Sequence, residues 1–448
     1  MFKRTNALLA LLVLVSLVLA ACTTPATEAP VPTEAPMTEV PATEATGTEA
    51  PATEAAGPFE CDDAIGCVDI AEGEPIHIAY ALVVSGPNES LGVDSRNAVE
   101  IAIDDIGGEI LGHPVRFDGE DEGCSAEGGQ AAATKLAADP TIVAVIGTNC
   151  SSAARVALPL IDQAGFVMIS SSNTAPDLTE PGSDNNFVPA YARVAHNDNL
   201  QGRVAAEYVF NELGLTTAAT IHDGSLYADQ LQQVFAARFQ ELGGTITAQE
   251  AVSPDQTDMS SVLSSIAAGT PEFIYFPIFM PAGAFIIRQV KQTPGLEDVP
   301  LMGADGLYSP DVIEGAAEDV EGFMVSSPAN AEGVEAEYAE KHQAKFGGPP
   351  PSTFHLHAYD SFMIIKNAIE AVAVEDADGT LHIGRQALRD AVHATEGHEG
   401  LTGVLSCNET VEPVKYPGDC AAAGIGIWEY HFGEFGPPAN PELIWTPE

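Results

Sequence analysis

The order of apolar and polar positions predicts an alternating α/β chain from about residue 59 onward. Residues 76–82 are apolar except for His77, which predicts a buried strand. A turn at Ser85-Gly86-Pro87 follows, and apolar residues then recur at helical spacing over about residues 93–106. The same alternation continues with predicted strands at 115–118, 142–146 and 167–170 and predicted helices at 130–138 and 153–163.

A second series of the same kind begins near residue 202. Strands that alternate with helices over short connections are typical of right-handed βαβ units around a parallel sheet. Two such series predict two doubly wound α/β lobes with mostly parallel sheets, in which ligands bind outside the carboxyl ends of strands. The second series comprises predicted helices at 202–213, 230–242, 259–268, 284–291, 310–316 and 353–373, and predicted strands at 217–222, 245–251, 273–277, 300–303 and 425–432.

The first residues read as an export signal. Lys3 and Arg4 precede an apolar run over residues 7–21 that is too short for a transmembrane helix. The ending Leu19-Ala20-Ala21-Cys22 resembles the lipobox of bacterial lipoproteins, in which the signal is cut before the cysteine and its thiol is acylated. We therefore expect a signal peptide at 1–21, a lipidated Cys22 and an extracytoplasmic protein, periplasmic or at the cell surface, anchored to the cell membrane.

Residues 22–58 predict a disordered tether. After Cys22 they cycle through Ala-Thr-Glu-Ala-Pro units without an aromatic or basic residue, so they cannot bury enough apolar surface to fold. The whole chain has 17 Lys and Arg against 65 Asp and Glu, a net charge of -48, which repels phosphate backbones and excludes nucleic acid as a partner. The tether supplies few of these acids, so the surplus lies mainly on the lobes.

The cysteines predict disulfides rather than metal or redox chemistry. Besides Cys22, six cysteines remain in an exported chain, and pairing of sequence neighbours is the simplest of their possible connectivities. The neighbour pairs are Cys61 with Cys67, Cys124 with Cys150, and Cys407 with Cys420.

Enzyme signatures are missing from the sequence. There is no Gly-x-Ser-x-Gly, no phosphate-binding Gly-rich loop and no His-Glu-x-x-His, so we predict no catalytic residue and no cofactor. His355 and His357 are candidate metal ligands, as are His393 and His398. The first pair falls in a predicted helix, where positions i and i+2 point to different sides, so we predict no metal site.

A cleft is predicted beside residues 144–178. The strand 142–146 leads through Cys150 to Ser151, where a helix begins, and free N–H groups at a helix start bind small anions such as carboxylates. The competing reading is a plain serine N-cap without a ligand. The strand 167–170 ends in small hydroxyl residues as far as Thr174, which places a second polar edge beside the first.

Several short motifs occur along the chain in an order that resembles a known family. They are Ser85-Gly86-Pro87, Val145-Ile146-Gly147 with Cys150-Ser151-Ser152, Ile169-Ser170 with Thr174 and Pro176, Tyr227 after His222-Asp223, and Met302-Gly303-Ala304-Asp305-Gly306. In this order, over about residues 74–432, the chain resembles the leucine/isoleucine/valine-binding family, the type I periplasmic binding proteins of branched-chain amino acid ABC importers. The Cys124 and Cys150 pair also matches a disulfide of that family.

The resemblance implies a two-lobed receptor that closes over its ligand like a Venus flytrap. The lobes would be joined by a three-strand hinge with crossings near Tyr191, Ala329 and Ile425. The implied first lobe comprises residues 59–192 plus 330–424, and the second comprises residues 193–329 plus 425–448.

The resemblance also implies a role for each site residue. Ser151 and Thr174 would hold the α-carboxylate of an amino acid, while the carbonyl of Ser172 and the side chain of Asp305 would hold its ammonium. A carboxylate that is desolvated by closure needs a cationic partner, which suits Asp305. The competing reading of Asp305 is a turn residue in Ala-Asp-Gly.

The residues predicted to face the side chain of the ligand are apolar or aromatic. Leu91 and Phe279 stand where the best-known family members have tyrosines, and with Tyr227 they would suit an apolar side chain. The family also includes receptors for amides, urea and aromatic acids, so the ligand class is better supported than the ligand itself.

We therefore predict a monomeric, lipid-anchored solute-binding protein without catalysis. It would capture an amino acid, branched-chain or similarly apolar, and deliver it to the permease and ATPase subunits of an ABC importer. The alternatives are a ligand-sensing module for a membrane receptor, or a binding protein for an amide, urea or aromatic acid.

Overall fold

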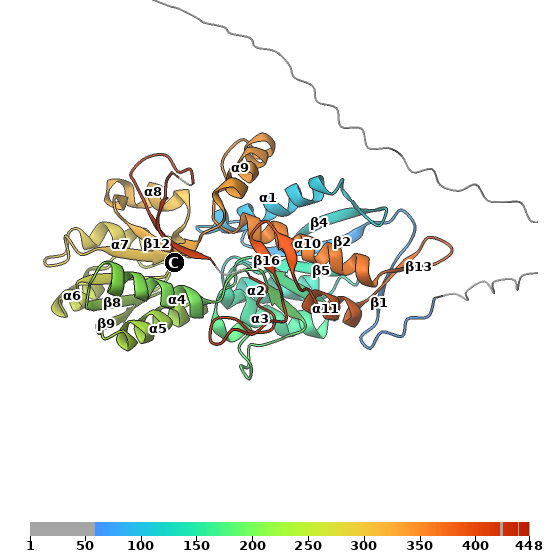
Figure 1. Cartoon of the computed structure of the whole chain (residues 1–448), viewed down its shortest axis with the longest axis horizontal. Coiled ribbons are helices and arrows are strands. Elements are labelled where there is room, and N and C mark those ends of the chain that lie inside the picture. Colours follow the sequence, from blue (N-terminus) through green and yellow to red (C-terminus); the bar gives the residue numbers. More distant parts are fainter. Residues whose placement is uncertain (1–58, 422–423, 438, 448) are drawn as a thin grey trace, which may run out of the picture. The chain divides into compact units, whose positions relative to one another are not determined.

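The structure is a computed structural model that describes residues 59–421, 424–437 and 439–447 (Figure 1). The predicted signal peptide, Cys22 and the tether lie outside the described residues and stay predictions. Within the described ranges, no helix is both long enough and apolar enough to cross a membrane.

Two mostly parallel sheets form the framework, as predicted. In the first sheet β2, β4, β5, β6 and β7 run parallel, and only the short β3 is antiparallel to its neighbour. All residues of β5 are buried, because helices cover both faces of a parallel sheet. The order of the strands is β3 (Glu109–Ile110), β4 (His113–Asp121), β2 (Ile76–Leu82), β5 (Ile142–Gly147), β6 (Val167–Ser170) and β7 (Tyr191–Arg193).

The second sheet has a parallel centre and an antiparallel edge. Strands β8 to β12 pair in parallel, and β17 and β18 add antiparallel strands beyond β12. The order is β18 (Glu442–Trp445), β17 (Ile425–Glu429), β12 (Met324–Pro328), β11 (Leu301–Ala304), β10 (Phe273–Tyr275), β8 (Thr217–His222) and β9 (Thr245–Ala251). The chain thus enters this sheet after β7, leaves it after β12 and returns at β17.

Each sheet has its own helices and apolar core. The first is covered by α1 (Glu89–Asp105), α2 (Ala126–Leu136), α3 (Ser151–Gln163), α10 (His355–Val372) and α11 (Arg385–His393). The second is covered by α4 (Asp198–Glu207), α5 (Leu226–Glu241), α6 (Ser260–Ala268), α7 (Ala282–Val290) and α8 (Pro310–Ala316).

Shorter elements complete the described chain. They are α9 (Glu332–Phe346), the π-helical turn η2 (Tyr208–Glu212), the 3₁₀ turns η1 (Pro176–Leu178), η3 (Asp305–Leu307) and η4 (Ala317–Val320), and two small antiparallel sheets made of β1 (Cys67–Ile70), β14 (Leu381–Gly384) and β13 (Val374–Glu375), and of β15 (His398–Gly400) and β16 (Gly403–Leu405).

Most predicted elements are present, but several helices begin earlier than predicted. Helix α1 begins at Glu89 and α5 at Leu226, about four residues before the predicted starts. Apolar periodicity begins only where a helix meets the core, whereas the polar first turn is marked by its cap. In α5, for example, the Ser225 hydroxyl accepts the N–H of Ala228.

Strand β12 and helices α9 and α11 were not predicted. Helix α11 turns two arginines toward the core, where Arg385 donates to the carbonyls of Pro140 and Ile142, and Arg389 donates to the carbonyl of Phe166. Arginine at core-facing positions hides the apolar period that would reveal an amphipathic helix.

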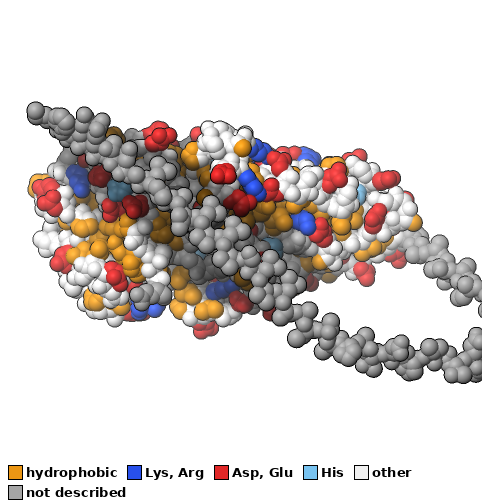
Figure 2. All heavy atoms as spheres, turned by 45° about the horizontal axis from the view of Figure 1, so that its top comes forward, with side chains coloured by type: hydrophobic (Ala, Val, Ile, Leu, Met, Phe, Trp, Pro, Cys, Tyr) orange, Lys and Arg blue, Asp and Glu red, His pale blue; other side chains and the backbone are white. Residues whose placement is uncertain are grey.

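The three neighbour disulfides are present. Cys61 is bonded to Cys67, Cys124 to Cys150 and Cys407 to Cys420. On the face shown in Figure 2, Asp and Glu side chains are spread over the described surface rather than gathered in one patch. This distribution fits the prediction that the acidic surplus lies mainly on the folded body.

Candidate functional site

The predicted site residues come from the carboxyl ends of parallel strands in both sheets. Ser151 begins α3 after β5, and Thr174 lies in the loop after β6. Tyr227 lies in the first turn of α5 after β8, and Asp305 begins η3 directly after β11. All four side chains are buried. Because each follows the carboxyl end of a strand, they lie at the sheet edge where α/β folds bind ligands.

Ser151 is not the N-cap of its helix. Cys150 occupies that position without a side-chain cap bond, and Ser151 is the first helical residue. Its hydroxyl accepts the N–H of Ala175 at 3.3 Å and so ties the start of α3 to the loop after β6. The expectation that Ser151 is the N-cap is therefore wrong, and its contact with a ligand stays a prediction.

The hydroxyls after β6 differ in their bonding. The hydroxyl of Ser172 donates to the carbonyl of Asn149 and accepts from its amide, at 3.2 and 2.9 Å. The hydroxyl of Thr174 is buried without a hydrogen-bond partner. A buried hydroxyl without a partner is costly, so Thr174 has bonding capacity that a ligand can satisfy.

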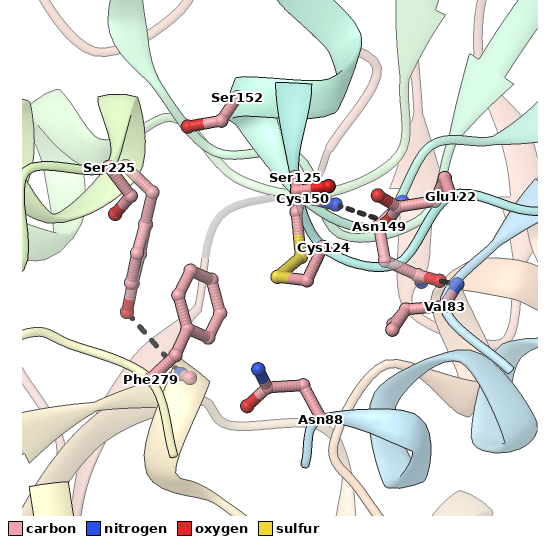
Figure 3. Close-up of a disulfide and its surroundings, with 12 residues drawn as sticks. Val83, Asn88, Glu122, Cys124, Ser125, Asn149, Cys150, Ser152, Ser225 and Phe279 are labelled. Carbon is pink, nitrogen blue, oxygen red and sulfur yellow. Dashed lines mark hydrogen bonds between the residues drawn. A yellow bond between two sulfur atoms is a disulfide. The ribbon is translucent and has the colours of Figure 1, made fainter. Parts of the chain in front are cut away.

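Asn149 and Glu122 organise the turn before Ser151, and sequence reasoning missed both (Figure 3). The Asn149 side chain accepts the N–H of Val83 at 2.9 Å, and Glu122 accepts the backbone N–H groups of Asn149 and Cys150 at 3.2 and 3.1 Å. Burial raises the pKa of Glu122 to about 8. No local motif marks Glu122, because its partners lie a helix and a strand away.

Asp305 is held by two donors from other elements. Its Oδ1 accepts from the Gln201 amide at 2.6 Å and from the Tyr227 hydroxyl at 3.3 Å. The Gln201 amide also donates to the carbonyl of Ser326 at 2.9 Å, and its oxygen lies 2.5 Å from Nε2 of His196. Burial raises the pKa of Asp305 to about 6 despite these hydrogen bonds. A carboxylate in this setting gains stability from a cationic partner.

Asp198 is a second buried carboxyl at this site, and no local motif marks it. It is the first residue of α4, it is fully buried, and the Thr174 hydroxyl is the side-chain hydrogen-bonding group nearest to its carboxyl. Burial and the charge of Asp305 raise the pKa of Asp198 well above its ordinary value.

An apolar cluster also lies at this site, and Figure 3 shows the Phe279 ring and the Cys124–Cys150 disulfide that belong to it. Leu91 packs with Val83, Phe354 and the Cys124–Cys150 disulfide, and the Phe279 ring packs against this group. The Phe279 ring centre also lies 5.0 Å from that of Tyr227.

The recess lined by Leu91, Phe279 and Asp305 contains only about 10 Å³ of free space. This is room for about one water molecule, so an amino-acid side chain enters only when Phe279 or its surroundings move.

Hydrogen bonds join elements of the two sheets around this recess. The Ser90 hydroxyl donates to Asp311 at 2.6 Å, and the N–H of Met280 donates to the Asn88 side chain at 3.2 Å. On the far side of the Cys124–Cys150 disulfide, the N–H of Leu226 donates to the Ser152 hydroxyl at 2.9 Å. The two halves are therefore in contact across the site.

Two of the histidines that were weighed as metal ligands, His355 and His357, lie in different electrostatic surroundings. Among the residues described, no group of three or more His, Cys, Asp or Glu side chains is placed to hold a metal ion. His355 lies between Glu335 and Asp94, and although burial acts against it, their charges raise its pKa to about 10. Burial lowers the pKa of His357 to about 3, so the two residues differ in charge at neutral pH.

Comparison with known proteins identifies the family. Residues 75–410 match the family model described as periplasmic binding protein. The chain belongs to the periplasmic binding protein family. Members of this family bind solutes outside the cytoplasm and are receptors rather than enzymes.

Curated relatives of this periplasmic binding protein are distant. The leucine-, isoleucine-, valine-, threonine- and alanine-binding protein of Pseudomonas aeruginosa is 27% identical over 80% of this chain and 90% of its own. The Leu/Ile/Val-binding protein of Escherichia coli K12 is 27% identical over 60% of this chain and 74% of its own.

Solved structures share the fold. The leucine binding protein LivK of Thermotoga maritima has a TM-score of 0.69 at 23% identity, covering 80% of this chain and 96% of that one. A solute binding protein from R. palustris in complex with benzoate has a TM-score of 0.66 at 18% identity, covering 79% and 93%. At these identities the likeness establishes the two-lobed architecture and not the ligand.

Proposed function

We propose that this periplasmic binding protein captures an amino acid with a branched-chain or similarly apolar side chain. The observation that carries the proposal is the buried Asp305 carboxyl, which forms no salt bridge with any described Lys, Arg or His residue. It lies at the same site as the buried Thr174 hydroxyl and the start of α3. An α-amino acid has the complementary groups, an ammonium for the first and a carboxylate for the other two.

The proposed side-chain subsite is the wall of Leu91, Phe279 and Tyr227. The cluster that Leu91 and Phe279 join is apolar, and the Tyr227 hydroxyl turns to Asp305, which leaves the Tyr227 ring face against Phe279. Burial of apolar surface stabilises an aliphatic side chain there by about 25 cal/mol per Å². Ser172 completes the proposed ammonium site through its carbonyl.

In the proposed binding cycle the two predicted lobes move relative to each other about a hinge. The lobes are residues 59–192 plus 330–424 and residues 193–329 plus 425–448. The chain passes between them near Tyr191, Ala329 and Ile425. The ligand docks on the first lobe through Ser151 and Thr174. Closure brings Tyr227, Phe279 and Asp305 over it, and only this differential contact shifts the population toward the closed form.

The proposed destination of the ligand is an ABC importer. Named relatives bind leucine, isoleucine and valine, and one structural neighbour is titled a branched-chain amino acid transporter substrate binding protein. A lipidated Cys22 and the tether to residue 58 would hold the monomeric receptor near the permease.

Titration calorimetry of the purified protein with L-leucine, L-isoleucine and L-valine tests this function. We expect binding by the wild type, and we expect Asp305→Ala to weaken it at least a hundredfold, because the ammonium loses its buried counter-charge. Asp298→Ala, which removes an exposed carboxylate outside the site, is the control. Wild-type protein that binds no amino acid would contradict the function, and an unchanged Kd in Asp305→Ala would contradict the ammonium site.

A further inference from the structure

The Arg193 guanidinium is fully buried at the end of β7, and it donates to the loop that carries Thr174. Its Nη1 donates to the carbonyl of Asn173 at 3.1 Å and to that of Ala175 at 2.9 Å. These residues lie on either side of Thr174, so one guanidinium nitrogen holds the backbone before and after it. The Nη2 atom donates to the Thr179 hydroxyl at 2.8 Å, which holds the same loop at a second point.

Ala175 joins this backbone to the other proposed carboxylate ligand. Its carbonyl accepts from Arg193, while its N–H donates to the Ser151 hydroxyl at 3.3 Å. Ser151 and Thr174 follow β5 and β6, two strands that pair in parallel. The Arg193 guanidinium therefore helps to set the spacing between two hydroxyls that come from different segments of the chain.

Asp419 holds the Arg193 guanidinium in place. Its Oδ1 accepts from Nε at 2.6 Å, and the two side chains are 2% and 0% exposed. Its Oδ2 accepts from the Asn197 amide at 3.1 Å and from the N–H of Tyr416 at 3.0 Å. Both oxygens of Asp419 are thus used, so the carboxylate cannot turn without the loss of hydrogen bonds.

The segment around Asp419 is itself bonded to the end of β7. The Arg193 N–H donates to the carbonyl of Gly418, and the N–H of Cys420 donates to the carbonyl of Arg193, both at 2.8 Å. The disulfide between Cys407 and Cys420 closes this segment. The backbone that carries Asp419 is therefore fixed directly beside the guanidinium that Asp419 orients.

A buried ion pair can serve the fold alone, which is the competing explanation for Arg193 and Asp419. Desolvation offsets most of the attraction between buried charges, so apolar residues of similar volume often stabilise a core as well or better. A guanidinium offers instead several donors at fixed angles. Three of the four side-chain hydrogen bonds of Arg193 go to residues 173–179, which fits a role in the geometry of that loop.

We propose that Arg193 and Asp419 are positioning residues: they hold the two hydroxyls that would bind the ligand's carboxylate at the right spacing, and they thereby select ligands with an α-carboxylate. The inference rests on the proposed function and extends it. A polar site that is held in its bound geometry before the ligand arrives avoids the cost of ordering on binding. Without the guanidinium the ligand itself has to order the loop, and its affinity falls.

The test compares L-leucine with L-leucinamide, in which a neutral amide replaces the carboxylate. Titration calorimetry gives both Kd values, and thermal melting shows that each variant is folded at the temperature of the titration. We expect Arg193→Lys to weaken leucine binding by about tenfold or more, because one ammonium group cannot span Asp419 and both carbonyls in the fork geometry of arginine. The Kd of leucinamide should stay nearly unchanged. Asp419→Asn, whose amide nitrogen cannot accept a hydrogen bond, should change the ratio of the two Kd values in the same direction.

A purely structural role predicts a different result. Loss of binding-competent protein lowers the apparent affinity of every ligand by the same factor, so it leaves the ratio of the two Kd values unchanged. Hydrogen exchange of the unliganded protein gives a second measure. We expect the backbone N–H groups of residues 173–179 to exchange faster in Arg193→Lys than in the wild type, while those of α7 keep the wild-type rate.

Matched variants separate the loop contacts from general stability. Thr179→Val removes the acceptor of Nη2 but keeps the side-chain shape, and it should weaken leucine binding about threefold to tenfold, whereas Thr179→Ser keeps the hydroxyl and should restore most of the affinity. Arg389→Lys is the control for the arginine. Arg389 is also buried, and it donates to the carbonyls of Phe166 and Asp162, which precede β6 rather than follow it. This variant should be less stable than the wild type and have the same ratio of Kd values.

The outcomes separate the inference from the function. Wild-type protein that binds no amino acid overturns both. Folded Arg193→Lys with an unchanged Kd for leucine, or with both Kd values raised by the same factor, overturns the inference and leaves the function intact. If Arg193→Lys does not fold, Thr179→Val decides, because an unchanged affinity for leucine in that variant contradicts the positioning of the loop.

Discussion

The substitution Asp305→Asn should make the unliganded protein more stable while it removes the ligand affinity. Burial raises the pKa of Asp305 from 3.8 to about 6. A shift of about two units corresponds to about 3 kcal/mol that the folded protein loses when this carboxyl ionises. Asparagine has nearly the same shape, and its carbonyl oxygen can still accept from Gln201 and Tyr227.

The sign of the pH dependence follows from linkage. Because the folded pKa lies above the unfolded pKa, the folded wild type binds more protons between about pH 4 and 6, and its stability falls as the pH rises through this window. The variant lacks this loss. We therefore expect Asp305→Asn to be more stable than the wild type by about 1–3 kcal/mol at pH 8, with the difference vanishing near pH 4.

Thermal melting at pH 4, 6 and 8, with and without L-leucine, measures this difference. For lobes of this size, 1 kcal/mol shifts Tm by about 2–4 °C. Ligand should reverse the order, since the wild type gains stability from bound leucine and the variant loses an ion-pair contribution of about 3–5 kcal/mol, roughly 100- to 4,000-fold in Kd. A variant that melts below the wild type at pH 8, or that retains leucine-dependent stabilisation, would refute the reasoning.

Two further substitutions probe the supports of the site. Asp419→Ala should lower the free energy of unfolding by about 3–5 kcal/mol, because it leaves the Arg193 charge buried without its partner; a chemical denaturation midpoint equal to that of the wild type would show that the pair is dispensable. Phe279→Ala should enlarge the recess and shift the preference from leucine toward phenylalanine by about tenfold or more, and an unchanged ratio of the two Kd values in calorimetry would exclude Phe279 from the side-chain subsite.

The local pattern of apolar and polar residues predicted much of the fold. Mostly apolar runs such as Ile76–Leu82 and Thr217–His222 appear as strands within the predicted bounds, because a strand buried on both faces by helices is largely apolar. Ser151, Thr174 and Asp305 do follow strands β5, β6 and β11, as the sequence pattern predicted, and such strand ends are where α/β folds bind ligands.

Elements whose stability depends on distant partners escaped prediction. Helix α11 was missed because Arg385 and Arg389 occupy its core face, and they are acceptable there only because carbonyls from α3, β5 and their loops receive their donors. Strand β12 was missed because it is short and is stabilised by pairing with its neighbours β11 and β17, which the local sequence does not reveal.

The sequence by itself determined the α/β class and the neighbour pairing of the cysteines, which follow from periodicity and spacing. The candidate ligands Ser151, Thr174 and Asp305 came from the family resemblance together with the strand ends, and their roles stay predictions. Only the tertiary structure showed that Asp198 is buried where the charge of Asp305 acts on it and that Phe279 lines a recess with little free space. The physical reason is that the charge state and solvation of a buried carboxyl depend on groups brought together from several segments, which no single stretch of sequence contains.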